Sequence, residues 1–322
     1  MPYYQNSTLQ EELRLITKIA YLYHKQNMKQ SEIADQLDLS QATVSRILKR
    51  AEEEEIVRTT VNIPTGVYSE LENELCSKYG LKSAIVVHCE DGSDDAVFHY
   101  LGSAAAYYVE TTLGRNEIVG LSSWSSTLLS MVNSMHRFPK ASKAKVVQML
   151  GGMGNPSAKT YAARITEQFA KLVQGKPIYL PAPGVARSQD VLDDLKTDPY
   201  VREAYDLFDK VTLAIVGIGS VEPSKLLADS GNIFSAEELT DLQNAGAVGD
   251  ICLRFFDLEG VEVNLPLDKR VVSIQLDQLA QAKRIVGVAG GHRKLNAIRG
   301  ALNGKHINVL ITDHVSAMAL MY

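Results

Sequence analysis

The sequence predicts an α/β fold in which a small helical domain, residues 1–66, precedes a larger domain, residues 67–322, built on a parallel sheet. In the first part, apolar residues recur at steps of three and four, the period of one face of a helix. In the second part, short apolar runs alternate with longer helical patterns, as they do where helices cover a parallel sheet. The two patterns meet at Pro64–Thr65–Gly66, a turn sequence where we place the domain junction.

Three helices are expected in the small domain. The first is periodic from Leu13, and the segments SEIADQL and QATVSRILKRAEEE follow as the second and third. Ser31 is expected to cap the second helix and Ser40 the third, because a serine hydroxyl accepts a hydrogen bond from a free N–H of the first turn. Alternation over residues 57–63 predicts a short strand after them. The residues of the third helix expected to face inward are Val44, Ile47, Leu48 and Ala51.

The second and third helices have the spacing of a helix-turn-helix unit, whose second helix lies in the major groove of double-stranded DNA. Gln and Arg can form paired hydrogen bonds with a purine edge, so the first turns of the third helix are expected to read bases. Lys49 and Arg50, one turn later, suit phosphate contacts. The alternative is an ordinary helical hairpin with a solvated charged face. The expected DNA-contacting residues are Ser40, Gln41, Ala42, Thr43, Ser45, Arg46, Lys49 and Arg50.

Charge restricts how the chain can contact DNA. The formal net charge of −5 argues against a protein that coats nucleic acid through bulk electrostatics. Residues 1–60 carry eight Lys and Arg against nine Asp and Glu, so the small domain as a whole is nearly neutral. Only residues 40–50, with three basic side chains and no acidic one, are basic. DNA contact is therefore expected to be local to the third helix.

Eight apolar runs of the large domain are expected to form strands. Helical patterns such as residues 96–113 and 160–173 separate them, and their length suits a crossover between parallel strands. In an open parallel sheet, ligands bind at the carboxyl ends of the strands. The runs are residues 83–89, 117–121, 144–150, 176–181, 211–219, 270–276, 284–290 and 307–312.

The turn after residues 117–121 carries the clearest ligand signal. It is rich in hydroxyls and opens a helix, and free N–H groups together with the helix dipole favour an anion there. Simple helix capping is the alternative, and it needs only one hydroxyl. Trp124 could pack on the apolar face of a sugar or fill a gap in the core. The hydroxyl residues proposed to bind a phosphate or polyol are Ser123, Ser125, Ser126 and Thr127.

Glycine-rich turns follow three other strands, in MLGGMGN, VGIGS and AGGHRK, and are expected to share one rim. Gly151 and Gly152 belong to the first of them. Lys294 enters a helix after the third and could reach a phosphate or a sugar hydroxyl. Asp250 could accept hydrogen bonds from sugar hydroxyls, whereas His292 is expected at the surface.

Composition limits the other possibilities. No apolar stretch is long enough to span a membrane, and the first residues lack the order of a secretory signal, so the expected location is the cytoplasm. Cys76, Cys89 and Cys252 lie far apart without metal-ligand spacing, so neither a disulfide framework nor a zinc site is expected, and neither is a cofactor.

Eight segments, in order, resemble the SorC family of sugar-responsive bacterial transcriptional regulators. The resemblance covers nearly the whole chain and implies an effector domain with the fold of glucosamine-phosphate deaminases and ribose-phosphate isomerases, acting without catalysis and assembling into dimers or tetramers. It implies that Ser126 and Thr127 lie in the sugar- or phosphate-binding turn and that Asp250 and Lys294 contact the sugar. The segments are SEIADQLDLSQATVSRILKRA, GLSSWSSTL, VVQMLGG, YLPAPGV, AIVGIGS, GAVGDICLRFFDLEG, VAGGHRKLNAIRGAL and INVLITD.

Two positions depart from the family pattern. The turn SSWSST has serine where many relatives carry glycine. Leu150 stands where some deoxyribose-phosphate sensors place a Schiff-base lysine, so no covalent imine with the ligand is expected.

The sequence therefore predicts a regulator of a carbohydrate-catabolism operon whose operator binding responds to a sugar, sugar alcohol or sugar phosphate. Two alternatives stay open. One is an isomerase or deaminase-like enzyme that uses Asp250, His292 and Lys294 as acid–base groups. The other is an adaptor whose N-terminal helices bind a protein. Phosphorylation of the ligand also stays open, because Lys294 or Arg164 could supply the charge that a phosphate needs.

Overall fold

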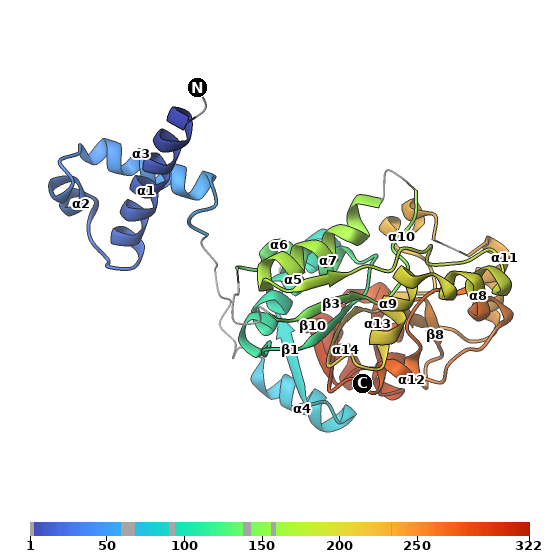
Figure 1. Ribbon diagram of the computed structural model, residues 1–322. Helices are drawn as coiled ribbons and strands as arrows, with labels where there is room; N and C mark the ends of the chain where they lie inside the picture. The colour runs from blue at the N-terminus through green and yellow to red at the C-terminus, as the bar shows by residue number, and fades with distance from the viewer. Residues whose placement is uncertain (1–2, 59–67, 90–93, 138–142, 156–158, 233) are drawn as a thin grey trace. The chain divides into compact units, whose positions relative to one another are not determined.

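A computed structural model describes residues 3–58, 68–89, 94–137, 143–155, 159–232 and 234–322 (Figure 1). The chain forms two compact units, residues 1–64 and 65–322. We describe each unit by itself.

The N-terminal unit is a three-helix bundle of α1 (Tyr3–His24), α2 (Gln30–Gln36) and α3 (Gln41–Glu53). The Ser40 hydroxyl accepts a hydrogen bond from the Thr43 N–H at 3.1 Å, which confirms the predicted cap of α3. The predicted Ser31 cap is wrong: Ser31 lies inside α2, and the Glu32 carboxylate accepts the N–H of the N-cap residue Lys29 at 2.8 Å. Residues 57 and 58 are not a strand, and the rest of the predicted strand 57–63 lies outside the described residues. The buried residues of this core are Ile16, Ile19, Ala20, Leu22, Ile33, Ala34, Val44, Leu48 and Ala51.

The second unit is built on a seven-stranded sheet in which each strand runs parallel to its neighbours. The predicted α/β fold with a parallel sheet is thus confirmed, and seven of the eight predicted strands are present. In sheet order they are β1 (Ser83–Val87), β10 (Val309–Asp313), β9 (Arg284–Val288), β5 (Leu213–Gly217), β2 (Ile118–Leu121), β3 (Lys145–Gln148) and β4 (Lys176–Ile178).

Helices cover both faces of this sheet (Figure 1), because successive strand residues point to opposite sides. Leu213 and Ile215 pack with α5 (Asp94–Thr112), α6 (Ser126–Ser134) and α7 (Lys159–Val173). Ala214 and Val216 pack in the opposite cluster, together with α4, α9, α13 and α14. The bounds of the other helices are α4 (Ser69–Tyr79), α8 (Gln189–Thr197), α9 (Pro199–Phe208), α10 (Lys225–Ser230), α11 (Ala236–Asn244), α12 (Leu276–Leu279), α13 (Leu295–Asn303) and α14 (His314–Met321).

The predicted strand 270–276 does not join the sheet. Its residues make isolated bridges, Val271 to Val185 and Ser273 to Leu150. Buried Arg254 holds this segment, since its guanidinium donates to the Val271 carbonyl at 3.1 Å and to the Ser273 hydroxyl at 3.2 Å. The apolar run was therefore a sign of burial and not of sheet pairing. A small antiparallel sheet that was not predicted contains β6 (Gly219–Ser220), β7 (Gly249–Ile251) and β8 (Arg254–Phe256).

Candidate functional site

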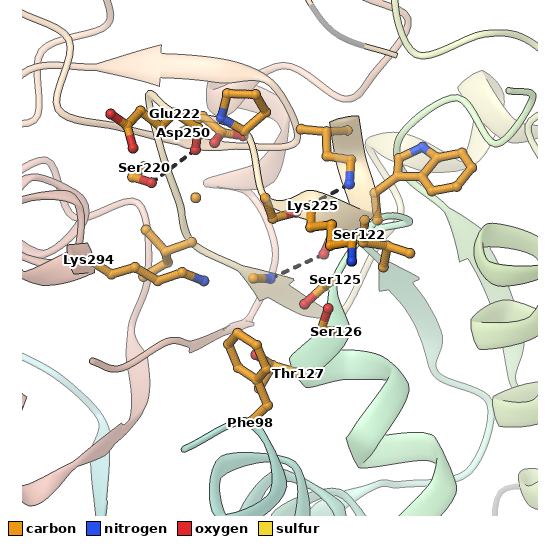
Figure 2. Close-up of a pocket in the computed structure, with 18 of the residues that line it drawn as sticks. Phe98, Ser122, Ser125, Ser126, Thr127, Ser220, Glu222, Lys225, Asp250 and Lys294 are labelled. Atoms are coloured by element: carbon orange, nitrogen blue, oxygen red, sulfur yellow. Dashed lines mark hydrogen bonds between the residues drawn. The ribbon is translucent and has the colours of Figure 1, made fainter. Parts of the chain in front are cut away.

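A cavity of about 530 Å³ lies where the order of the strands reverses. From β2 the chain continues to β3 and β4 toward one edge of the sheet, and from β5 it continues to β9 and β10 toward the other. β2 and β5 are neighbours, so the turns that follow them diverge and leave a crevice between them. The cavity is lined by residues of the turn 122–127, of 217–229, of 250–253 and of 290–294 (Figure 2).

The hydroxyl-rich turn after β2 forms one wall. Ser125 caps α6, since its hydroxyl accepts the Leu128 N–H at 3.2 Å. The Ser122 hydroxyl accepts the Gly217 N–H at 3.1 Å and so ties this turn to the end of β5. Ser126 and Thr127 also line the cavity, and the N–H groups of a first helical turn have no acceptor within the helix. Capping thus accounts for one hydroxyl of the turn, and the others face the cavity or brace it.

Ser123 and Trp124 play different parts. The Ser123 side chain is 1% exposed, donates to the Leu150 carbonyl at 2.6 Å and is not among the lining residues. We therefore assign it to packing. Trp124 does line the cavity, while its indole N–H donates to the Gly151 carbonyl at 3.0 Å. Its ring is thus fixed by the core, and part of its surface lines the cavity.

Gly151 and Gly152 are not among the residues that line the cavity. The Gly151 N–H donates to the Val272 carbonyl at 2.9 Å, and a Cβ at this position would lie 2.2 Å from the Pro183 carbonyl oxygen. A Cβ on Gly152 would lie 2.2 Å from the Gln148 side chain. These glycines permit close packing beyond the end of β3, which is their role in this fold.

Asp250 lies on β7 at the opposite wall. Its carboxylate accepts the Leu253 N–H at 2.8 Å. Burial raises the pKa of Asp250 to about 6, against the opposing effects of the Leu253 N–H and the Lys294 charge. Gly219 pairs with Asp250 across the small sheet, and a Cβ there would lie 2.0 Å from the Asp250 Oδ1. The absence of a side chain at Gly219 is what allows the carboxylate to occupy this place.

Lys294 enters from the turn after β9, and Figure 2 shows its side chain extending into the cavity toward Ser122 and Ser125. Its ammonium lies 5.9 Å from the centroid of the Phe98 ring. The preceding turn, residues 290–291, is fixed to the end of β10, because the Gly291 N–H donates to the buried Asp313 carboxylate at 2.7 Å. One polar cavity is therefore lined by the Lys294 ammonium, the Asp250 carboxylate and the serine turn, and the Phe98 ring adds an aromatic surface to it.

Sequence reasoning missed one wall, residues 222–229. It includes Lys225, which adds a cation to Arg293 and Lys294 in the cavity lining, and Glu222, which pairs with Arg293 at 3.3 Å. This segment has no glycine, and the signals that could have indicated it are its place after the VGIGS turn and Ser224, which lines the cavity and caps α10. Neither His292 nor Arg164 lines the cavity, and both side chains are exposed.

The exposed face of α3 is the second candidate site. Gln41, Ser45 and Arg46 are exposed, and the Arg46 guanidinium lies 3.3 Å from the Thr43 hydroxyl. Lys49 is within 3.8 Å of Glu53.

Arg50 contacts Glu54 at 2.5 Å and Glu12 of α1 at 3.2 Å. The bonds to Glu54 and Glu12 raise the pKa of Arg50. The guanidinium therefore joins α3 to α1 in the DNA-free protein, and a phosphate contact would require it to leave these partners.

Within the part of the chain that the structure describes, no helix is long and apolar enough to cross a membrane.

Comparison with known proteins identifies a family model for each of the two units. Residues 65–322 match the family model of a sugar-binding domain, and residues 18–61 match the MarR family. The deoxyribonucleoside regulator of Bacillus subtilis is 35% identical over 312 residues, which cover 97% of this chain and 98% of that protein. The sorbitol operon regulator of Klebsiella pneumoniae is 29% identical over 97% of this chain and 98% of its own length.

The crystal structure of that full-length regulator, SorC, superposes with a TM-score of 0.78 and covers 96% of this chain and 99% of its own. The helix-turn-helix unit, the parallel-sheet domain and the match along almost the whole length have one explanation. The chain belongs to the SorC family of DNA-binding transcriptional regulators.

Proposed function

We propose that this protein is a cytoplasmic regulator of a carbohydrate-catabolism operon, and that a sugar, sugar alcohol or sugar phosphate in the cavity between β2 and β5 modulates its binding to operator DNA. The observation that carries this is the convergence of the α6 N-terminus, Lys294 and Asp250 on one cavity at the point where strand order reverses. In this assignment residues 1–66 bind DNA and residues 67–322 bind the ligand and self-associate.

The chemistry of the cavity suits a polyhydroxylated ligand. The hydroxyls of Ser122, Ser126 and Thr127 can donate to and accept from sugar hydroxyls, and the Asp250 carboxylate can accept two such bonds. The free N–H groups at the start of α6 and the Lys294 ammonium can bind a phosphate. A volume of about 530 Å³ lies within the usual range for small-molecule sites. Two relatives are named as a deoxyribonucleoside regulator and a sorbitol operon regulator, which fits this ligand class.

On the DNA side, we assign base contacts to Gln41, Thr43, Ser45 and Arg46, beginning at the Ser40 cap. We assign a phosphate contact to Lys49. A dimer or tetramer would place two such helices on two half-sites, so we expect the operator to be a palindrome or nearly one. Ligand then changes DNA affinity through its different affinities for two arrangements of the assembly.

Thermal unfolding of the full chain against pentoses, hexoses, hexitols and their phosphates tests the ligand site. A ligand that binds the folded state alone raises the melting temperature, by an amount that grows with its concentration over Kd. We expect one compound to do so in the wild-type chain and in Lys269→Ala, which removes an exposed lysine outside the cavity, but not in Lys294→Ala. An equal shift in Lys294→Ala would place the ligand elsewhere.

The enzyme alternative has one observation in its favour, since a carboxyl group with a pKa of about 6 beside a lysine could exchange protons at neutral pH. Incubation of the protein with each sugar phosphate, followed by NMR of the substrate, separates the two functions. We expect no turnover. Steady conversion that is lost in Asp250→Asn would establish the enzyme.

A further inference from the structure

Three rings stack outside the cavity, at the carboxyl edge of the sheet. The His88 and His314 rings lie 4.8 Å apart with planes 26° from parallel, and the Tyr68 ring stacks on His314 at 5.6 Å. The Tyr68 hydroxyl is hydrogen-bonded to the His88 Nδ1 at 2.6 Å. The Cys89 N–H points at the His314 Nδ1, which accepts at 3.4 Å. We call Tyr68, His88 and His314 the ring stack.

Strand register explains why the two histidines meet. β1 and β10 are parallel neighbours, and their last residues, Val87 and Asp313, are paired. The residue after each strand is a histidine, so the two imidazoles leave the sheet side by side. Tyr68 joins them from α4, whose N-cap it is.

The ring stack is connected to the ligand cavity through Asp313. This carboxylate is 3% exposed and accepts the Gly291 N–H at 2.7 Å. A Cβ on Gly290 would lie 2.3 Å from the same oxygen atom, Asp313 Oδ2, so the turn 290–291 packs directly on the carboxylate. Gly290 and Gly291 line the cavity beside Lys294. A ligand that moves this turn therefore moves Asp313, and the next residue is His314.

The ring stack is connected to the DNA-binding unit through the chain itself. Tyr68 is the first described residue after 59–67, the segment that leads from the helical unit to the larger one. The edge strand β1 is fixed to α4 below it, since the Glu72 carboxylate accepts the Val86 N–H at 2.8 Å. A shift in the packing of the rings would therefore change the position of Tyr68, where the larger unit begins after the connecting segment.

We propose that the ring stack couples occupancy of the cavity to the segment that leads to the DNA reader. This inference rests on the proposed function, because it requires a ligand beside Lys294 that alters DNA affinity. Tyr68, His88 and His314 are positioning residues here: they touch neither ligand nor DNA, and they transmit the state of the turn 290–294 to the start of α4. The chain itself joins the ring stack to both sides, because Asp313, which binds the turn 290–291, directly precedes His314, and Tyr68 directly precedes α4.

The test compares the full-length wild-type chain with Tyr68→Phe and His88→Ala. Tyr68→Phe keeps the ring and removes the hydroxyl that bonds His88, and His88→Ala removes one exposed ring. Tyr200→Phe, which removes the hydroxyl of a 72% exposed tyrosine on α9, is the matched control. The probes are deoxyribose 5-phosphate, ribose 5-phosphate, glucitol and glucitol 6-phosphate.

Two quantities are measured for each protein: hydrogen exchange at residues 290–294 and 68–88, and the Kd for a DNA duplex selected from a random pool by the wild-type chain. We expect a probe to slow exchange at 290–294 in all four proteins, and at 68–88 only in the wild type and Tyr200→Phe. In those two the probe should change the DNA Kd by a factor on the order of 5–150, and in the ring-stack variants by less than about 2-fold.

The outcomes separate this inference from the proposed function. A merely structural role would weaken DNA binding with and without probe and leave their ratio unchanged, which would overturn the coupling. Protection at 290–294 without any change at 68–88 in the wild type would overturn it as well, while the ligand site would stand. If no probe protects 290–294, both the ligand site and the coupling fail.

Discussion

Two turns of this protein look alike in sequence and do different work. Both begin with Gly-Gly directly after a run of apolar residues, Gly151–Gly152 near β3 and Gly290–Gly291 after β9. The second turn lines the ligand cavity and presents Lys294 to it, whereas the first lies outside the cavity and packs against the chain at Pro183. A glycine-rich turn is therefore evidence of close packing, and the topology around it decides whether a ligand is what comes close.

The two glycine turns differ because different parts of the chain lie beyond the carboxyl ends of β3 and β9. Beyond β3 the crevice is filled by the chain itself, since Val272 and Ala182 carbonyls accept the N–H groups of Gly151 and Met153. At β9 the space above the turn is open, and the walls from β2 and β5 complete a cavity. Two substitutions test this contrast directly, and three more test the cavity wall and the DNA-binding unit, from the largest expected effect to the smallest.

Gly151→Ala should give the largest effect, and it should be on stability. Its Cβ would lie 2.2 Å from the Pro183 carbonyl oxygen and 2.7 Å from that of Ala182, and backbone atoms cannot be displaced without moving the chain. We expect the free energy of unfolding to fall by about 3 kcal/mol, as overpacked cores do. Urea denaturation measures the fall. The Kd for the ligand should stay within about 2-fold, and a large loss of ligand affinity would return Gly151 to the binding site.

Lys294→Ala should give the opposite pattern. Removal of a charged hydrogen-bonding group from the cavity should weaken ligand binding by about 2 kcal/mol, or roughly 30-fold in Kd. The side chain is only partly buried, so the melting temperature without ligand should change by no more than about 2 °C. Calorimetric titration gives the first value and thermal unfolding the second. A variant that lost stability and not affinity would reverse the contrast between the two turns.

From the sequence we could predict those site residues that are recognised by side-chain chemistry and by local structure. The hydroxyl turn and Lys294 follow from side-chain type and from place after a strand, whereas Asp250 follows from side-chain type alone, since it lies within the unpredicted strand β7. Predictions were less reliable where the outcome depended on long-range packing. The run 270–276 pairs with no strand of the seven-stranded sheet, because Arg254 binds its carbonyls. An arginine seventeen residues away in sequence gives no periodic signal. Lys225 was missed for the same reason, since only the folded path of residues 222–229 brings it to the cavity.

Asp250→Asn tests the wall opposite the serine turn. The folded pKa of Asp250, about 6, lies above its ordinary value of 3.8. As pH rises between these values the unfolded chain releases a proton that the folded chain retains, so the carboxylate costs stability above about pH 6 and costs none below about pH 4. Solvent in the cavity reduces this cost, to about 1–2 kcal/mol.

The substitution should therefore raise the melting temperature by roughly 2–6 °C at pH 8 and hardly at all near pH 4. Thermal unfolding of both proteins across this pH range is the measurement. A gain that is the same at every pH would mean that ionisation of Asp250 is not its cause. The ligand should bind Asp250→Asn more weakly, as expected where a binding group is maintained at the expense of stability.

In the DNA-binding unit, two neighbouring cations also look alike in sequence but differ in their contacts. Lys49 and Arg50 lie one turn beyond the residues that we propose read bases, and the sequence predicts phosphate contacts for both. In the structure the Lys49 side chain is 76% exposed and lies 3.8 Å from Glu53, whereas Arg50 is bound by Glu54 and Glu12. Of these two adjacent cations, Lys49 is therefore exposed at the surface, whereas Arg50 joins α1 to α3.

The smallest effect is expected for Arg50→Ala, which should change the Kd for operator DNA by less than about 3-fold. Exposed ion pairs of this kind contribute about 0–1 kcal/mol, so the orientation of α3 should survive their loss. Lys49→Ala should lower affinity about equally for all sequences and reduce the slope of log K against log salt by about 0.9, the value for one phosphate contact. Fluorescence anisotropy across a salt series measures both variants. If Arg50→Ala reduces the slope by the same amount, then Arg50 exchanges its carboxylate partners for phosphate on binding, and the DNA-free contacts do not predict the bound ones.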